Sequence, residues 1–414
     1  MRYILICLVA LTIVSCKNDA KSTNLDTEYQ QENTLKTGMY KAVLEVQDGE
    51  LLPFNFEVES ATQLKVFNAE EVIEVDEITY ENDSVVIKLP VFEGYISAKL
   101  EGDKLKGNFI IESLERSVPF SAELGVEKRF KTTSKPSQDV SGVWETIFSP
   151  NNAEDTYMAK GIFKQKGAVV TGTFRTTTGD YRFLEGVMDG NEMKLSAFDG
   201  AHAFLFKATV LDSTLEGVFY SGNHWKEPFT AKRNEAYELE KADNLTFLKE
   251  GYDSIDFEFP NTSDELVSLK DDRFKNKVVI VQIMGSWCPN CLDESKYYAE
   301  FYKNNKDKDI EFVGLAFEYA KTKEAAFSRI DRLADRVGID YPILLAQYGT
   351  SDKEKAQEKL PMLDHVLSYP TSIYIDKTGK VRKIHTGFNG PATGEKYIEF
   401  KNEFEAFVAE LLAE

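Results

Sequence analysis

The chain has 414 residues, which is too long for one ordinary hydrophobic core and favours two or three domains. Hydrophobic residues make up 42% and charged residues 29%, a balance typical of a folded, soluble body. The formal net charge of −20 argues against nucleic-acid binding over a broad surface, because such binding depends on clustered Lys and Arg.

Residues 1–15 are typical of a bacterial lipoprotein signal peptide. Arg2 precedes an apolar run over 4–14, which is too short for a membrane-spanning helix of roughly 20 residues and fits the core of a secretory signal. Ile13-Val-Ser-Cys16 resembles the lipobox of bacterial lipoproteins, in which the Cys is acylated; an ordinary cleaved signal is the alternative. We therefore expect lipidation at Cys16, which anchors the protein to a membrane, and a flexible polar tether over 16–36.

Two cysteines remain free after this processing. Cys7 leaves with the signal peptide and Cys16 is blocked by lipid, so Cys288 and Cys291 are the free thiols in an oxidising compartment, the cell envelope or periplasm. A structural disulfide between them would close a very small loop, and the entropic stabilisation by a disulfide grows with loop length. A redox role is therefore favoured over a structural one.

Residues 37–233 have the short alternating runs and frequent Gly, Asn and Asp of β-structure. Four landmarks recur at an offset of 104 to 110 residues: Gly38-Met-Tyr40 and Gly142-Val-Trp144, Phe92-Glu-Gly94 and Phe198-Asp-Gly200, Leu105 to Phe109 and Leu215 to Phe219, Pro119 to Ala122 and Pro228 to Ala231. We predict an all-β region of two related halves, barrels or sandwiches, over 37–127 and 140–233. The alternative is that any antiparallel meander offers such pairs.

A charged segment over 232–250, which is consistent with a helix, leads to the last domain, and we place the linker at 234–251. Strands and helices alternate over 252–414, which indicates an α/β layer. The expected strands are 277–283, 310–316, 371–375 and 381–384, and the expected helices are 292–306, 322–337 and 395–412. The stretch Asp376-Lys-Thr-Gly-Lys380 indicates a hairpin between the last two strands.

The stretch Gly285-Ser-Trp-Cys-Pro-Asn-Cys291 lies between a predicted strand and a predicted helix. Cys288 then stands at a helix N-terminus, where unpaired N–H groups and the helix dipole favour a thiolate. Pro289 suits the first helical turn, because it has no N–H to leave unpaired. We expect Cys288 to be the exposed nucleophile and Cys291, one turn further, to resolve the mixed disulfide.

Three motifs occur together in 252–414: Trp287-Cys-Pro-Asn-Cys291 after an apolar strand, Tyr369-Pro-Thr371 before Ser-Ile-Tyr-Ile-Asp, and Lys-Thr-Gly-Lys-Val in the hairpin. This part of the chain resembles the thioredoxin-like thiol-disulfide reductases of the bacterial envelope, the TlpA and ResA group. The resemblance implies a thioredoxin-like α/β fold, dithiol exchange through a redox-active Cys288–Cys291 disulfide, and no cofactor. It also implies disulfide-containing envelope clients, a membrane thiol as electron donor, and reduction as the favoured direction, for example in cytochrome c maturation.

The resemblance assigns roles to further residues. Pro370 would be a cis proline that faces the dithiol and shapes a groove for an extended client segment. The residues expected to border the client are Trp287, Pro289, Tyr369 and Thr371. Glu294 matches an acidic residue on the active-site helix and would move the proton of the resolving thiol if burial raises its pKa. A solvated helix carboxylate is the alternative for Glu294.

Two positions depart from related sequences. Gln282 stands where thioredoxin has a buried Asp, so its amide cannot titrate, and Lys296 stands where the group has a proline that kinks the helix. A metal site is not expected, because the cysteine pair needs further ligands and neither His365 nor His385 has ligand spacing to it.

Two other functions remain as alternatives. Peroxiredoxins share the fold, but they carry a Thr-x-x-Cys pattern around the reactive thiol. Here Gly285 stands in the place of that threonine, three residues before Cys288. The protein is alternatively a binding scaffold lipoprotein whose β-rich half carries the main function, with an apolar ligand or client peptide inside a barrel. The intact Cys-x-x-Cys motif favours the enzyme.

Overall fold

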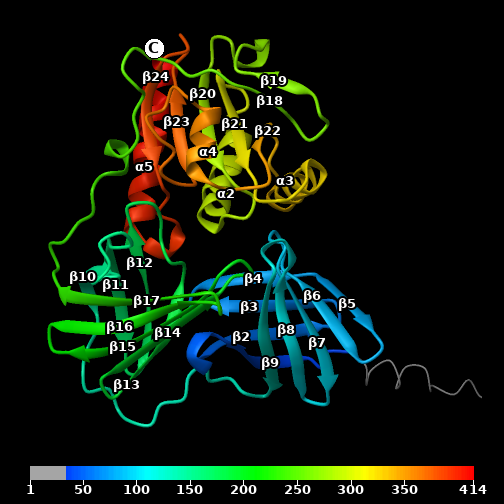
Figure 1. Cartoon of the computed structure of the whole chain (residues 1–414), viewed down its shortest axis with the longest axis vertical. Coiled ribbons are helices and arrows are strands. Elements are labelled where there is room, and N and C mark those ends of the chain that lie inside the picture. The colour runs from blue at the N-terminus through cyan, green and yellow to red at the C-terminus, as the bar shows by residue number, and fades with distance from the viewer. Residues whose placement is uncertain (1–33) are drawn as a thin grey trace, which may run out of the picture.

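The computed structural model describes residues 34–414, which form two β-rich units next to one α/β unit (Figure 1). The predicted signal peptide at 1–15, the lipidation site Cys16 and the tether up to residue 33 lie outside the described residues. Among residues 34–414, no helix is long and apolar enough to cross a membrane.

The first β unit is an antiparallel sheet of nine strands. Its strands are β1 (Gly38–Glu45), β2 (Leu51–Ser60), β3 (Gln63–Asn68), β4 (Glu71–Val75), β5 (Glu77–Glu81), β6 (Ser84–Lys88), β7 (Tyr95–Glu101), β8 (Lys104–Ile111) and β9 (Arg116–Leu124). The order β4-β3-β2-β1-β9-β8-β7-β6-β5 places the consecutive strands β4 and β5 at the two edges, so the sheet is open at Asp76. Tyr40, Ala42 and Leu44 show why the strands form: every second side chain of β1 is buried.

The second β unit is a closed barrel of eight antiparallel strands. They are β10 (Gly142–Phe148), β11 (Tyr157–Lys166), β12 (Val169–Thr176), β13 (Leu184–Asp189), β14 (Glu192–Phe198), β15 (Ala203–Leu211), β16 (Thr214–Ser221) and β17 (Trp225–Arg233), and β17 pairs with β10. Aromatic side chains pack together in its core, among them Phe148, Phe163, Phe174, Phe206 and Phe229. An eight-stranded barrel is just wide enough for its own side chains, so this interior is occupied by core.

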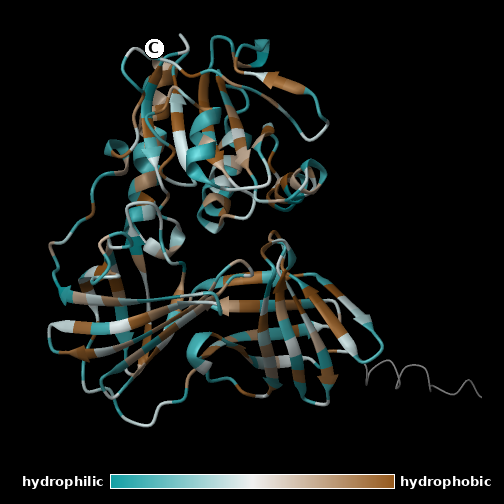
Figure 2. Ribbon diagram, in the orientation of Figure 1, coloured by the Kyte–Doolittle hydropathy of each residue, from teal (hydrophilic) through white to brown (hydrophobic). Residues whose placement is uncertain are grey.

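The repeated landmarks occupy matching places in the two units. Tyr40 and Trp144 lie in the first strands, β1 and β10, whereas Pro119 and Pro228 lie in the last strands, β9 and β17. Figure 2 shows hydrophobic and hydrophilic residues alternating along the ribbons of both units. This agreement of position supports the prediction of two related halves.

The two Phe-x-Gly landmarks interlock neighbouring units. Phe198, at the end of β14, lies in the core of the first β unit, with its ring 4.3 Å from that of Phe54 and 5.0 Å from that of Phe109. Phe92, its counterpart between β6 and β7, lies instead in the core of the α/β unit. Each motif therefore places its phenylalanine in the core of a neighbouring unit.

The segment between the barrel and the α/β unit contains no α-helix, so the helical interpretation of 232–250 is wrong. The one regular element there is a 3₁₀ turn at Ala242–Asn244. The extended chain instead finds partners on the α/β unit: Asp243 accepts a 2.7 Å hydrogen bond from His385, and Thr246 bonds Thr386 at 2.8 Å. These contacts satisfy the polar side chains in a conformation that a helix could not supply.

The α/β unit is built on a five-stranded sheet in the order β22-β21-β20-β23-β24. Its strands are β20 (Val278–Met284), β21 (Ile310–Phe317), β22 (Ile343–Gln347), β23 (Thr371–Ile375) and β24 (Val381–Thr386), and a small hairpin, β18 (Glu258–Pro260) and β19 (Leu266–Ser268), precedes them. Its helices are α2 (Pro289–Asn304), α3 (Lys323–Val337), α4 (Lys353–Lys359) and α5 (Glu395–Ala413). Strands β20 and β21 are parallel and buried along their whole length, which explains their continuous apolar runs.

Helix α3 fastens the α/β unit to the open side of the first β unit. Arg332 and Arg336 lie four residues apart on one helix face, and their guanidinium groups lie 2.7 Å from Glu77 and 2.9 Å from Asp76. Arg329, one turn earlier, pairs with Glu93. The position of the α/β unit on the first β unit is therefore held by a row of ion pairs.

Candidate active site

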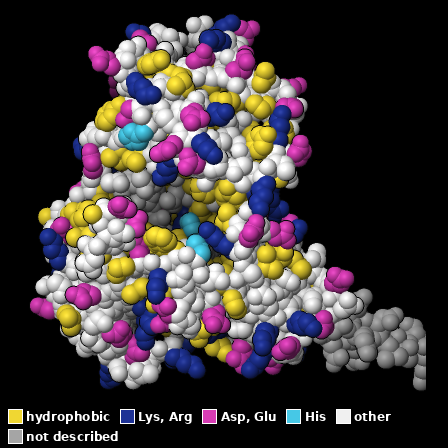
Figure 3. Space-filling model, viewed as in Figure 1, with side chains coloured by type: hydrophobic (Ala, Val, Ile, Leu, Met, Phe, Trp, Pro, Cys, Tyr) yellow, Lys and Arg dark blue, Asp and Glu magenta, His cyan; other side chains and the backbone are white. Residues whose placement is uncertain are grey.

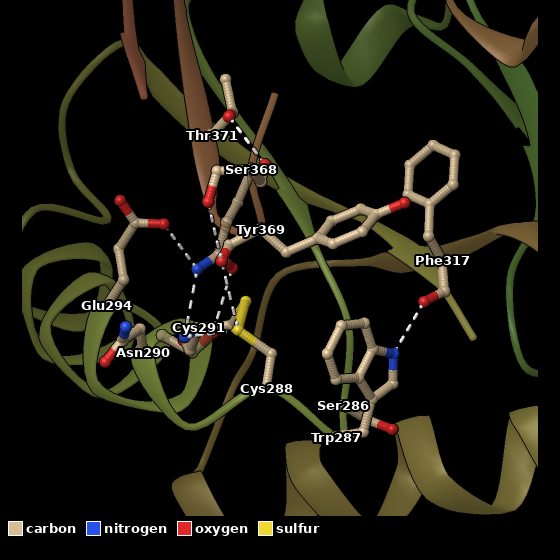
Figure 4. Close-up of a disulfide and its surroundings, with 12 residues drawn as sticks. Ser286, Trp287, Cys288, Asn290, Cys291, Glu294, Phe317, Ser368, Tyr369 and Thr371 are labelled. Atoms are coloured by element: carbon tan, nitrogen blue, oxygen red, sulfur yellow. Dashed lines mark hydrogen bonds between the residues drawn. A yellow bond between two sulfur atoms is a disulfide. The ribbon is translucent and has the colours of Figure 1, made fainter. Parts of the chain in front are cut away.

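The two cysteines lie where strand β20 leads into helix α2 (Figure 4). They form a disulfide. Cys288 is the N-cap residue of α2, and its sulfur accepts the backbone N–H of Cys291 at 3.1 Å. Pro289 occupies the first helical turn. The helix N-terminus thus directs the N–H of Cys291 at the sulfur of Cys288, an arrangement that favours a thiolate there.

The Cys288 side chain is not exposed, contrary to the expectation from the sequence. Cys288 is 5% exposed and Cys291 is fully buried. The loop between β12 and β13, residues 177–183, lies over the site: the hydroxyl of Ser368 donates to the carbonyl of Thr178 at 3.4 Å. A β-carbon added at Gly179 of this loop would overlap the side-chain amide of Asn290, which stands between the two cysteines. The barrel, which comes from a distant part of the chain, therefore contributes a loop that lies beside the cysteine pair.

The segment before β23 lies beside the disulfide. The Tyr369–Pro370 peptide bond is cis, and the carbonyl oxygen of Tyr369 lies 3.5 Å from the sulfur of Cys288. The hydroxyl of Thr371 donates to the carbonyl of Ser368 at 2.9 Å and so fixes the turn. The structure thus brings Tyr369, Pro370 and Thr371 next to the cysteine pair.

Glu294 is a fully buried carboxyl group one turn along α2 from Cys291. Its Oε2 accepts a 2.8 Å bond from the amide of Gln282, and its Oε1 accepts bonds from the hydroxyls of Ser372 at 3.0 Å and Tyr298 at 3.2 Å. Burial raises the pKa of Glu294 to about 7, against the lowering effect of these three hydrogen bonds. The carboxyl group is thus able to take up and release a proton near neutral pH.

Gln282 connects this carboxyl group to the cysteine pair. Its side-chain amide donates to Glu294 and lies 3.4 Å from the carbonyl oxygen of Cys291, while its own oxygen accepts from Ser295 at 3.0 Å. The amide cannot titrate, so Glu294 is the ionisable member of this group. Tyr298 and Ser372 are site residues that the sequence analysis missed: Tyr298 belongs to no motif, and Ser372 was quoted in the strand motif without a role.

Trp287 and Glu294 lie on opposite sides of the disulfide (Figure 4). The Trp287 indole N–H donates to the carbonyl of Phe317 at 2.9 Å, which fixes the ring. Glu318 was also missed by the sequence analysis: its carboxylate is fully buried and accepts both the backbone N–H (2.7 Å) and the hydroxyl (2.8 Å) of Ser286. A β-carbon at Gly285 would overlap the indole ring, so this arrangement leaves no room for the threonine of the peroxiredoxin pattern.

A cavity of about 570 Å³ opens between the three units beside Trp287. Figure 3 shows it as a hollow on the viewed face, with hydrophobic and histidine side chains around it. The aromatic residues that line it are Phe92, Phe109, Tyr181, Phe204, Phe219, Trp225, Trp287 and Tyr319. Arg116, His202 and His224 supply its basic groups. Burial, with the charges of Arg116 and His202, lowers the pKa of His224 to about 4, so His224 is neutral at physiological pH.

The model of the Redoxin family matches residues 249–398. The C-terminal unit is a redoxin domain. Known relatives agree: the chain is 28% identical over 140 residues to the thioredoxin-like protein YneN of Bacillus subtilis, covering 34% of this chain and 73% of the relative. It is also 28% identical over 140 residues to the thiol-disulfide oxidoreductase ResA of the same organism, covering 34% of this chain and 69% of the relative.

A thiol-disulfide oxidoreductase from Bacteroides fragilis is similar in structure, at 23% identity and a TM-score of 0.26, over 36% of this chain and 99% of that one. The family match and the relatives confirm the predicted thioredoxin-like domain and the predicted enzyme class, thiol-disulfide oxidoreductase. The structure confirms the predicted all-β region before that domain. The roles of the individual site residues stay predictions.

Proposed function

We propose that the protein reduces disulfides of protein clients in the cell envelope through the Cys288–Cys291 dithiol. The observation that carries this proposal is a Cys288–Cys291 disulfide at a helix N-terminus with a buried carboxyl group of pKa about 7 one turn away. The Cys288 thiolate attacks one client sulfur and forms a mixed disulfide, while the other client sulfur leaves as a thiolate. Cys291 then attacks Cys288, which releases the reduced client and leaves the Cys288–Cys291 disulfide.

Glu294 takes part in the second step in this proposal. Cys291 must lose its proton before it attacks, and the Glu294 carboxylate accepts that proton, with Gln282 holding the carboxylate in place. Pro370 faces the sulfurs and leaves its side of the groove open, because proline has no N–H. Tyr369 and Thr371 border the client on that side, and Trp287 and Pro289 border it on the other. An external thiol then supplies two electrons to restore the dithiol.

The cellular setting belongs to the same proposal. The lipobox-like sequence at Cys16 supports a lipid anchor, and an oxidising envelope compartment supports a membrane thiol protein as electron donor. Clients whose cysteines await haem attachment, as in cytochrome c maturation, fit a reductase of this kind. The proposed location is the periplasmic side of the cell envelope.

The Cys291→Ser variant is expected to accumulate mixed disulfides with its clients, because the first attack proceeds and the release step is missing. The variant is expressed in the envelope, and acid is added to protonate free thiols and stop disulfide exchange. The adducts are separated on non-reducing gels and identified by mass spectrometry. The double variant Cys288→Ser/Cys291→Ser is the control and is expected to trap nothing. Equal recovery of adducts from both variants would contradict attack by Cys288.

The cavity beside Trp287 favours a second function, binding of apolar client segments by the β units. Its volume lies in the range of ligand sites, and aromatic side chains from all three units line it. The barrel interior does not serve this purpose because core residues fill it. The cavity would hold an unfolded client segment next to the redox motif.

Trp225→Ala is expected to weaken binding of an unfolded polypeptide by about tenfold or more, because aromatic anchors carry much of the binding energy at such sites. Trp225 is partly exposed at the cavity, so its removal leaves the barrel core intact. The probe is a carboxymethylated, permanently unfolded polypeptide without free thiols, titrated by calorimetry. The control is Phe247→Ala, an exposed aromatic residue that does not line the cavity. Equal affinities for both variants would rule out this binding site.

A further inference from the structure

The loop between β12 and β13, which we call the lid segment (residues 177–183), is held on the redoxin domain by one buried arginine. Arg182 is 3% exposed, and its guanidinium group meets carboxylates from all three units. Glu71 of the first β unit lies 2.8 Å from Nη2, and Asp199 of the barrel lies 3.3 Å from Nε. Asp293 of helix α2 pairs with Nη1. One cation thus joins the active-site helix to both β units.

Asp293 is the redoxin-domain member of this cluster and stands two residues after Cys291. Glu71 and Asp199, the other two carboxylates at Arg182, belong to the β units, so Asp293 is the carboxylate that ties this arginine to the redoxin domain. A fourth carboxylate, that of Asp180 in the lid segment, accepts the backbone N–H groups of Arg182 at 2.8 Å and of Gly390 in the redoxin domain at 2.7 Å. The lid segment is therefore held by charge at Arg182 and by a hydrogen bond at Asp180.

The tip of the lid segment occupies the client side of the redox site. The backbone of Thr178 packs against Gly387, since a β-carbon added at Gly387 would lie 2.7 Å from the Thr178 backbone. The carbonyl of Thr178 also accepts a hydrogen bond from the hydroxyl of Ser368, which precedes Tyr369. Gly179 packs against Asn290. These contacts flank the cysteine pair, because Ser368 precedes Tyr369, whose carbonyl oxygen lies 3.5 Å from the Cys288 sulfur, and Asn290 stands between the two cysteines. A client protein cannot reach the sulfur while the lid segment stays in this place.

We propose that the lid segment is an autoinhibitory lid, with the Arg182–Asp293 ion pair as its latch, and that clients gain access to Cys288 only when the latch opens. This inference rests on the proposed role of Cys288 as the nucleophile. The ion pairs of α3 with Asp76, Glu77 and Glu93 hold the redoxin domain on the first β unit. The lid segment has no regular secondary structure beyond an isolated bridge at Asp180, and in this proposal its tip, Thr178 and Gly179, is the part that moves.

The test measures how fast the Cys288 thiol reacts with a bulky reagent. The chain from Lys17 onward, which keeps every described residue, carries Cys291→Ser so that Cys288 is its one thiol. Asp293→Ala, which removes the latch on the redoxin side, is expected to speed alkylation by a polyethylene-glycol maleimide at least about tenfold, because the rate follows the fraction of open molecules. The matched control is Glu300→Ala, an exposed carboxylate on the same helix.

A second variant is expected to open the lid by adding a side chain that does not fit, instead of removing a charged group. Gly179→Ala adds a β-carbon against Asn290 and is expected to raise the same alkylation rate. Rates for Asp293→Ala and Gly179→Ala that equal those of Glu300→Ala and of the parent would overturn the lid.

The proposed function is judged separately, in the background with both cysteines. Faster alkylation of the open variants, with no reduction of insulin disulfides by any variant under dithiothreitol, would support the lid and contradict the reductase. Unchanged alkylation alongside normal insulin reduction would overturn the lid and leave the reductase standing.

Discussion

Replacing Cys288 by Ser is expected to abolish disulfide reduction, with turnover falling by at least about a thousandfold, because the nucleophile of the first step is lost. Serine keeps the size of the side chain and its ability to accept the N–H of Cys291 at the helix N-terminus. The measurement is reduction of insulin disulfides with dithiothreitol as electron donor, together with the thermal unfolding midpoint of the reduced proteins.

Cys291→Ser is the comparison that separates the two sulfurs. It also loses turnover, but its single remaining thiol still attacks one disulfide per molecule and stays in the adduct. A Cys288→Ser variant that formed such adducts as readily as Cys291→Ser would contradict the assignment of nucleophile and resolving thiol.

Replacing Glu294 by Gln is expected to change how stability depends on pH. Burial raises the pKa of Glu294 from 4.5 to about 7, so between these values the folded protein binds more protons than the unfolded chain. The stability that this proton supplies is complete below pH 4.5 and is lost as the pH rises through 7. The glutamine side chain of the variant stays neutral at every pH, so at pH 8 Glu294→Gln is expected to be more stable than the natural chain by about 3 kcal/mol.

The measurement is denaturant unfolding of the oxidised protein at several values between pH 4 and 8, since cysteines in a disulfide do not titrate. Glu300→Gln, an exposed carboxylate of the same helix, is the control and is expected to follow the natural chain at every pH. The Glu294→Gln variant is also expected to slow client release about a hundredfold, because the proton acceptor for Cys291 is gone. A stability difference that did not change with pH would contradict the raised pKa.

The redox motif and its supporting strand were predictable because the information is local. Trp287-Cys-Pro-Asn-Cys291 follows an apolar run that forms β20, and Thr322 and Gly338 supply the caps that delimit α3. Pro370 was placed by resemblance, not by spacing. The short run Ile343–Gln347, which forms β22, was not predicted. Its apolar residues and the preceding Pro342, which marks the start of the run, are typical of a buried strand.

The surroundings of the motif were not predictable, because they come from other units. Arg182 and Asp293 are separated by 111 residues, and no pattern along the chain links them. The contacts of Thr178 with Ser368 and of Gly179 with Asn290 likewise join residues that are far apart in the sequence. The linker was misjudged for a similar reason: the partners of Asp243 and Thr246 lie on β24, and tertiary contacts override weak local propensity.

The first β unit and the redoxin domain each receive a phenylalanine side chain from a neighbouring unit, which matters for protein engineering. Phe198 lies in the core of the first β unit and Phe92 in that of the redoxin domain, so these two units do not fill their interiors alone, whereas the barrel core consists of barrel residues. A redoxin domain separated at the linker would lack the Phe92 side chain in its core. Transfer of the redox site to another protein therefore requires another side chain in the place of Phe92, which the first β unit supplies here.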